Sequence, residues 1–162
     1  MSAVRILTVT VSDTRTETDD TSGARLAELL QEAGFVVKRH PPIRDEVDII
    51  TDVVRSSASD GEIDVIILTG GTGIAPRDVT PEAIEAIFEK RLEGFGEEFR
   101  RRSWDLIGPR AMLSRATAGL VRGSLVFSLP GSEKAVELGV ELLAPALPHM
   151  VDLATGRATR HP

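Results

Sequence analysis

The sequence predicts an α/β fold, namely a three-layer α/β/α sandwich around a mostly parallel central sheet. Short apolar runs rich in β-branched residues alternate along the chain with segments in which apolar residues recur at helical spacing. This alternation implies parallel strands with helices on both faces of the sheet. Right-handed crossovers then bring the strand ends at Ser12-Asp13, Thr69–Gly73 and Leu129–Ser132 to one edge, where such sheets bind ligands.

The composition is that of one soluble globular domain, which we expect at residues 1–153, with residues 154–162 as a loose tail. A net charge of -6 and an aromatic content of 4% argue against a nucleic-acid surface, which needs basic stripes and stacking rings. The chain contains no cysteine, and no apolar run is long enough to cross a bilayer. We therefore expect a cytoplasmic protein without a nucleic-acid or membrane partner.

The first strand is predicted at Ile6–Val11, which is rich in β-branched residues. A polar loop, residues 14–22, leads to a helix whose apolar positions i, i+3, i+4 and i+7 are Leu26, Leu29, Leu30 and Ala33. Gly34 ends this helix, and a second strand starts at Phe35 and is closed by Pro41-Pro42. A second amphipathic helix then carries Val47, Ile50 and Val54 on one face, before a turn at residues 56–62.

The short apolar run Ile63–Leu68 predicts a strand buried on both faces of the sheet. It is followed by Thr69-Gly70-Gly71-Thr72-Gly73, which we call the glycine loop. Thr80 is expected to cap the next helix, with Pro81 in its first turn. The apolar positions of that helix are Ile84, Ile87, Phe88 and Leu92.

Gly94-Phe95-Gly96 is expected to break that helix, and Glu97–Ile107 forms another, with Phe99 and Leu106 facing inward. After Gly108-Pro109, a short strand is predicted at Leu120–Gly123 and a stronger one at Ser124–Leu129. Ser132 then caps a helix that carries Val136, Val140 and Leu143. Pro145–Leu153 is apolar enough to pack as a short last helix.

The glycine loop is the strongest candidate for a ligand site. Three glycines in four positions allow positive φ angles and let a ligand approach bare amides, and a helix N-terminus that follows favours anions. The loop lacks the Gly-Lys-Ser/Thr of a Walker loop, and Pro76 stands at the third glycine position of the dinucleotide fingerprint. It is a candidate phosphate loop of neither common kind, although a plain strand-to-helix turn has the same composition.

Two aspartates near this loop allow two interpretations each. Asp78 forms a turn or an ion pair with Arg77, or it lies beside bound phosphates, where Mg²⁺ needs one or two protein oxygens. Spacing alone makes Asp45 the N-cap of the second helix. It matters for a metal only if the fold brings it to the same edge of the sheet.

These motifs together resemble the signature of the MoaB/MogA family of molybdenum cofactor biosynthesis proteins, which includes molybdopterin adenylyltransferases. The central match is the glycine loop with Pro76–Glu82, and it extends to Val11–Asp13, Asp45-Glu46, Gly94–Glu97, Leu113–Arg115 and Leu129–Ser132. The resemblance implies a sandwich that binds molybdopterin, ATP and Mg²⁺ and forms homo-oligomers, either trimers or hexamers. The terminal phosphate of molybdopterin would attack the α-phosphate of ATP, giving adenylated molybdopterin and pyrophosphate.

The resemblance also implies residue roles. Asp45 and Asp78 match the family's two important aspartates, so both are expected to be catalytic and to hold Mg²⁺. Nucleotide and phosphate contacts are expected from Ser12, Asp13, Thr69, Gly70, Gly71, Thr72 and Gly73, and pterin contacts from Ser114, Arg115, Pro130, Gly131 and Ser132. Two alternatives stay open: a non-catalytic molybdopterin-binding or scaffold paralogue, and a nicotinamide- or flavin-dependent oxidoreductase, which the missing third glycine disfavours.

Overall fold

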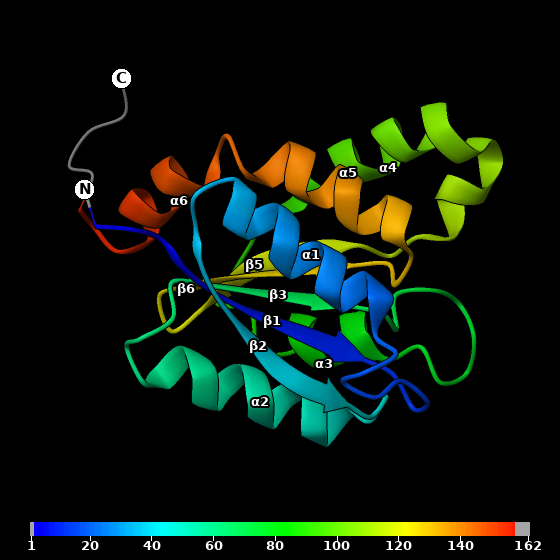
Figure 1. The fold of residues 1–162 in the computed structure, drawn as a ribbon, viewed down its shortest axis with the longest axis horizontal. Coiled ribbons are helices and arrows are strands. Elements are labelled where there is room, and N and C mark those ends of the chain that lie inside the picture. Colours follow the sequence, from blue (N-terminus) through cyan, green and yellow to red (C-terminus); the bar gives the residue numbers. More distant parts are fainter. Residues whose placement is uncertain (1, 158–162) are drawn as a thin grey trace.

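The computed structural model of this chain describes residues 2–157 and contains one six-stranded sheet between two layers of helices (Figure 1). The strands are β1 (Arg5–Val11), β2 (Val36–Ile43), β3 (Val65–Thr69), β4 (Lys90–Arg91), β5 (Thr117–Val121) and β6 (Ser124–Leu129), in the order β2-β1-β3-β6-β5-β4. The first four strands in this order run parallel, whereas β5 runs antiparallel to both of its neighbours. The predicted α/β/α sandwich with a mostly parallel sheet is confirmed.

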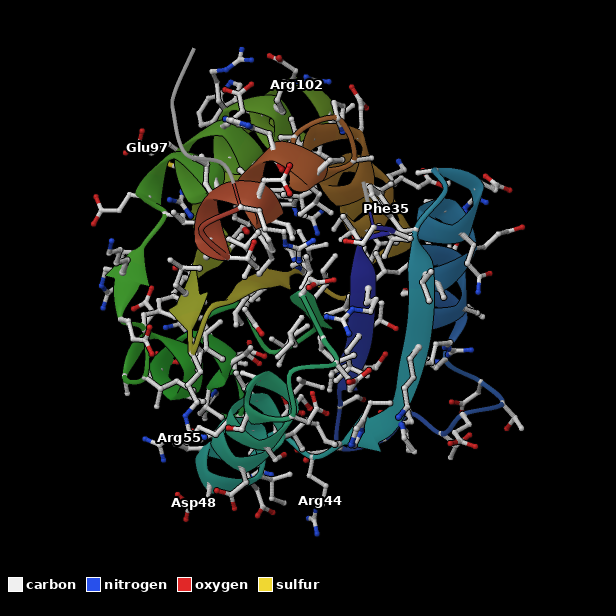
Figure 2. All side chains as sticks on the ribbon, turned by 90° about the vertical axis from the view of Figure 1, so that its left-hand side faces the viewer. Phe35, Arg44, Asp48, Arg55, Glu97 and Arg102 are labelled. Carbon is white, nitrogen blue, oxygen red and sulfur yellow. The ribbon has the colours of Figure 1, made fainter. Side chains whose placement is uncertain are left out.

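Two helices, α2 (Val47–Ser59) and α3 (Thr80–Glu85), cover one face of the sheet (Figure 1). The other face carries α1 (Thr21–Glu32), α4 (Glu93–Ile107), α5 (Glu133–Leu143) and α6 (Leu147–Ala154), and a 3₁₀ helix, η1 (Gly108–Leu113), follows α4. Figure 2 shows Arg102 of α4 and Asp48 of α2 on opposite outer sides. Every residue of β3 is buried, because β3 lies centrally in the sheet and contributes to the apolar core on both faces.

Two elements extend further than predicted. The strand β2 continues through Pro41-Pro42 to Ile43, because it is an edge strand bonded only to β1, where a missing proline N–H costs no ladder bond. The helix α2 extends into the turn predicted at residues 56–62 and ends at Ser59. Its serines are accommodated because the hydroxyl of Ser56 donates to Val53 O and that of Ser59 to Arg55 O, while Ala58 is buried.

The segment after the glycine loop also differs from the prediction. The helix α3 ends at Glu85, and Lys90–Arg91 pairs with β5, so Leu92 lies outside that helix. Gly96 lies within α4 and does not break it. Glycine is needed at this position because a Cβ would lie 2.6 Å from Ala116 O, so the helix packs closely against that carbonyl. Along α4, Phe99 is buried as predicted, whereas Leu106, in the last turn beyond the buried Ser103, is 61% exposed.

The last elements agree more closely with the prediction. The strand at Ser124–Leu129 is confirmed, whereas its partner β5 lies earlier than predicted because Arg122-Gly123 forms a tight hairpin turn with both φ angles positive. Ser132 caps α5 by accepting from Ala135 N at 3.1 Å. The tail was predicted at residues 154–162, of which 158–162 lie outside the described residues. Arg157, the last described residue, donates from its side chain to Ser2 Oγ. Within residues 2–157, no helix has the length and apolarity that a membrane span requires.

The strand register sets the edge at which the candidate site lies. Thr10 pairs with Thr69 and Thr69 with Leu129, so β1, β3 and β6 end at the same level. The end of β2 joins them because Ser12 N donates to Ile43 O at 2.8 Å. The predicted shared edge is therefore confirmed, and Asp45, two residues beyond β2, also lies there.

Candidate active site

The glycine loop has the open backbone that its composition predicts. Gly70 and Gly71 have φ angles of +99° and +68°, which residues with a Cβ rarely adopt. Gly70 N donates to Leu129 O at 2.9 Å, and a Cβ on Gly70 would lie 2.3 Å from Val11 O. Only glycine therefore lets the ends of β1 and β3 approach this closely.

Thr80 holds the loop from the other side and does not cap α3 as predicted. Its hydroxyl donates to Gly70 O at 2.9 Å, its amide donates to Gly71 O at 3.1 Å, and the N-cap residue is Val79. Because α3 has only six residues and Pro81 has no N–H, little of a helix N-terminus is left for a ligand. The amides of residues 71–73 remain as the candidate anion-binding groups, since Gly70 N is bonded to Leu129 O.

The two predicted aspartates lie against this loop. A Cβ at Gly71 would lie 2.9 Å from Asp45 Oδ1, and a Cβ at Gly73 would lie 2.7 Å from Asp78 Oδ2. The capping interpretation of Asp45 is wrong, because the N-cap of α2 is Glu46 and no side chain bonds there. Asp78 does form the predicted turn, since its Oδ2 accepts from Ala75 N at 2.9 Å.

Arg77 pairs with Asp13 and not with Asp78. Its Nε and Nη2 donate to the two carboxylate oxygens of Asp13 at 2.9 and 3.0 Å, and Asp45 N donates to the same carboxylate at 3.1 Å. The guanidinium lowers the pKa of Asp13 below its usual value. Sequence reasoning missed Arg77 as a site residue, because its partner lies 64 positions away and no local signal joins them.

Three carboxylates, those of Asp13, Asp45 and Asp78, gather negative charge at this site. Burial raises the pKa of Asp45, and the charges of Asp13 and Asp78 raise it further. Asp13 is neutralised by Arg77, whereas neither Asp45 nor Asp78 has an ion-pair partner within residues 2–157. No group of three or more potential metal-ligating side chains occurs in that range. Two carboxylates suit Mg²⁺, which takes its other ligands from substrate phosphates and water.

We expect Asp45→Asn to raise the thermal stability of the free protein slightly at neutral pH. The folded-state pKa of Asp45 lies above the unfolded value of 3.8, so ionisation of this carboxyl lowers the stability of the folded protein as the pH rises through the raised pKa. Asparagine carries no such charge, so the difference in Tm should be present at pH 7 and should vanish below the unfolded value. Differential scanning calorimetry between pH 3 and 8 measures it, and a lower Tm for the variant at neutral pH would contradict it.

The remaining residues predicted to contact the nucleotide differ in whether their polar groups are exposed and free to bind a ligand. The hydroxyl of Ser12 accepts from Thr14 N and Arg15 N at 3.2 and 3.1 Å, so it organises its own loop. Thr69 is buried, and its hydroxyl has no hydrogen-bond partner within residues 2–157. Thr72 is also buried, and its carbonyl accepts from Arg115 N at 3.0 Å.

The residues predicted to contact the pterin lie next to the loop on the side of α4 and α5. Ser114, Pro130 and Ser132 line one pocket of about 80 Å³, and Ser114 with Arg115 lines a larger one of about 370 Å³ between α4 and β5. Gly131 lies against the loop, since a Cβ there would lie 3.4 Å from Gly70 Cα. Arg115 differs from the others because its guanidinium donates to the glycine-loop segment itself.

Comparison with known proteins places this architecture among proteins of molybdenum cofactor synthesis. Residues 6–149 match the family model described as "Probable molybdopterin binding domain". The chain is 46% identical to molybdenum cofactor biosynthesis protein B of Bacillus subtilis (strain 168), over 91% of this chain and 88% of that protein.

Two solved structures are similar over nearly their whole length. A crystal structure of a molybdenum cofactor biosynthesis protein B has a TM-score of 0.91 at 44% identity, covering 95% of this chain and 97% of that one. The molybdopterin biosynthesis enzyme MoaB of Thermus thermophilus has a TM-score of 0.82 at 36% identity, covering 94% and 97%.

Proposed function

This chain belongs to the MoaB/MogA family of molybdopterin-binding proteins, and from that premise we propose that it transfers AMP from ATP to the terminal phosphate of molybdopterin. A terminal phosphate oxygen of molybdopterin forms a bond to the α-phosphorus of ATP. The bond from that phosphorus to the oxygen bridging it to the β-phosphate breaks, and pyrophosphate leaves with the electron pair. The products are adenylated molybdopterin and pyrophosphate.

Positioning and charge stabilisation do most of the work in such a transfer. We expect the amides of residues 71–73 to bind phosphate oxygens, beside the Arg77–Asp13 ion pair at the same edge. Mg²⁺ held by Asp45 and Asp78 would neutralise charge on the α-phosphate and on the departing pyrophosphate. No general base is needed, because the attacking phosphate is already ionised at neutral pH.

One observation carries this proposal: Asp45 and Asp78 lie against the same glycine loop, and neither forms an ion pair within the described residues. The test is incubation of the purified protein with molybdopterin, ATP and Mg²⁺, following adenylated product and pyrophosphate. We expect both products in equal amounts, and none when EDTA replaces Mg²⁺. Binding of molybdopterin without any product would overturn the proposal in favour of the non-catalytic paralogue.

We also propose that the protein forms homo-oligomers through an exposed apolar patch at the end of α4 and on η1. The patch comprises Trp104, Leu106, Ile107, Met112 and Leu113. Several large apolar side chains exposed on consecutive elements are typical of an interface between proteins. A second copy of this chain is the proposed partner, in agreement with the trimers or hexamers that the family resemblance implies.

The double variant Met112→Ser/Leu113→Ser is expected to be monomeric, because it removes two apolar anchors from the patch. Size-exclusion chromatography with light scattering measures the mass. Val47→Ser changes an exposed valine on the opposite face of the sheet and should leave the mass unchanged. A wild-type monomer, or an oligomeric double variant, would refute this interface.

A further inference from the structure

We propose that Arg115 is a positioning residue that holds the ATP-binding loop in shape, and not a contact to the pterin. This inference rests on the proposed function for what the loop binds. Arg115 lies two residues before β5, in the segment that joins η1 to this strand. Four hydrogen bonds, from its side chain and its amide, tie it to the loop segment and to α3.

The contacts of Arg115 enclose the segment that carries Asp78. Its Nε donates to Gly73 O at 2.9 Å and its Nη2 donates to Asp78 O at 2.9 Å, so one guanidinium holds both ends of the segment. Its own amide donates to Thr72 O at 3.0 Å. The four residues in between, 74–77, are exposed, so polar contacts and not apolar packing hold them: Arg77 pairs with Asp13, and Ala75 N donates to Asp78 Oδ2. Arg115 therefore fixes the main chain from which the Asp78 carboxylate projects.

Glu82 on α3 holds the guanidinium in this orientation. Its carboxylate accepts from Arg115 Nη1, and this contact lowers the pKa of Glu82 below its usual value. All three kinds of guanidinium nitrogen are thus engaged by protein oxygens. A planar fork with fixed donors suits two carbonyls and a carboxylate at once, which a lysine ammonium cannot reproduce. Three of the five guanidinium N–H donors are thus used within the protein, and a role in shaping the loop accounts for all three bonds.

The test compares Arg115→Lys and Glu82→Gln with the wild-type protein. We expect Arg115→Lys to weaken binding of Mg²⁺ with α,β-methylene-ATP by about tenfold, and Glu82→Gln by about threefold, in titration calorimetry. Binding of molybdopterin should change less than twofold in both. In turnover assays the KM for ATP should rise while the KM for molybdopterin stays constant. Without any ligand, amide hydrogen exchange across residues 70–79 should be faster in Arg115→Lys.

A second Arg–Glu pair provides the matched control. Arg102 and Glu141 join α4 to α5, and their side chains are 34% and 61% exposed, against 34% and 51% for Arg115 and Glu82. Arg102 lies on the outer side of α4 (Figure 2). Arg102→Lys and Glu141→Gln should leave nucleotide binding and loop exchange unchanged.

Two results would overturn this assignment. One is weaker molybdopterin binding by Arg115→Lys with unchanged nucleotide binding, which would make Arg115 a pterin contact. The other is an Arg115→Lys variant whose loop exchange and nucleotide affinity both equal those of the wild-type protein. Failure of the proposed reaction is distinguishable from both. If the wild-type protein makes no product, loop exchange and nucleotide binding can still differ between the wild-type protein and Arg115→Lys.

Discussion

Asp78→Asn is expected to leave a folded protein that transfers AMP about 10²–10³-fold more slowly than the wild-type protein. Asparagine can still accept the hydrogen bond from Ala75 N, so the turn persists while the charge is lost. Asp45→Asn should reduce turnover to a similar extent, because both carboxylates lie against the glycine loop, where we propose that they hold one Mg²⁺. The measurement is the initial rate of pyrophosphate release at saturating ATP and Mg²⁺.

Asp48→Asn is the matched control for these variants. Asp48 is exposed in the first turn of α2, three residues beyond Asp45, and Figure 2 shows its side chain at the outer side of the molecule. This variant should keep its activity, which separates the loss of a site charge from the loss of any acidic group near α2. Wild-type activity in both Asp45→Asn and Asp78→Asn would show that neither aspartate holds a metal ion.

Gly71→Ala is expected to abolish nucleotide binding and to lower stability. A left-handed backbone costs a residue with a Cβ about 1–2 kcal/mol. The added methyl group would also lie 2.4 Å from Thr80 Oγ1 and 2.9 Å from Asp45 Oδ1. The methyl group therefore displaces either the Thr80 hydroxyl, which holds the glycine loop, or the Asp45 carboxylate, which faces that loop. Calorimetric titration with Mg²⁺ and α,β-methylene-ATP, together with the Tm, measures the two effects.

Gly34→Ala separates the cost of backbone strain from obstruction of the site. Gly34 follows α1 and has a φ angle of +94°, yet a Cβ there would meet no atom of the described residues within 4 Å. Gly34→Ala should lower the stability by about 1 kcal/mol and leave nucleotide binding intact. If Gly71→Ala binds the nucleotide as well as Gly34→Ala does, the bare backbone at Gly71 is not part of the binding site.

The sequence was most informative where short-range patterns decide the structure. The buried strand β3, the strand β6 and the cap at Ser132 were all predicted, because apolar periodicity and capping depend on neighbouring residues. The predictions failed where a distant partner decides the outcome. Pro41-Pro42 stays in a strand because β2 lies at the sheet edge, and Gly96 stays in a helix because the carbonyl of Ala116 packs against it.

The sequence by itself determined the sandwich architecture and the place of the glycine loop, and through the family resemblance it predicted the roles of the two aspartates. Only the tertiary structure decided that Asp45 leaves its helix uncapped and faces Gly71, that Arg77 pairs with Asp13, and that Arg115 encloses the loop. The physical reason is range. Capping and periodicity act within a few residues, whereas the contacts from Arg77 and Arg115 join positions 64 and 42 apart, which meet only once the parallel strands are aligned.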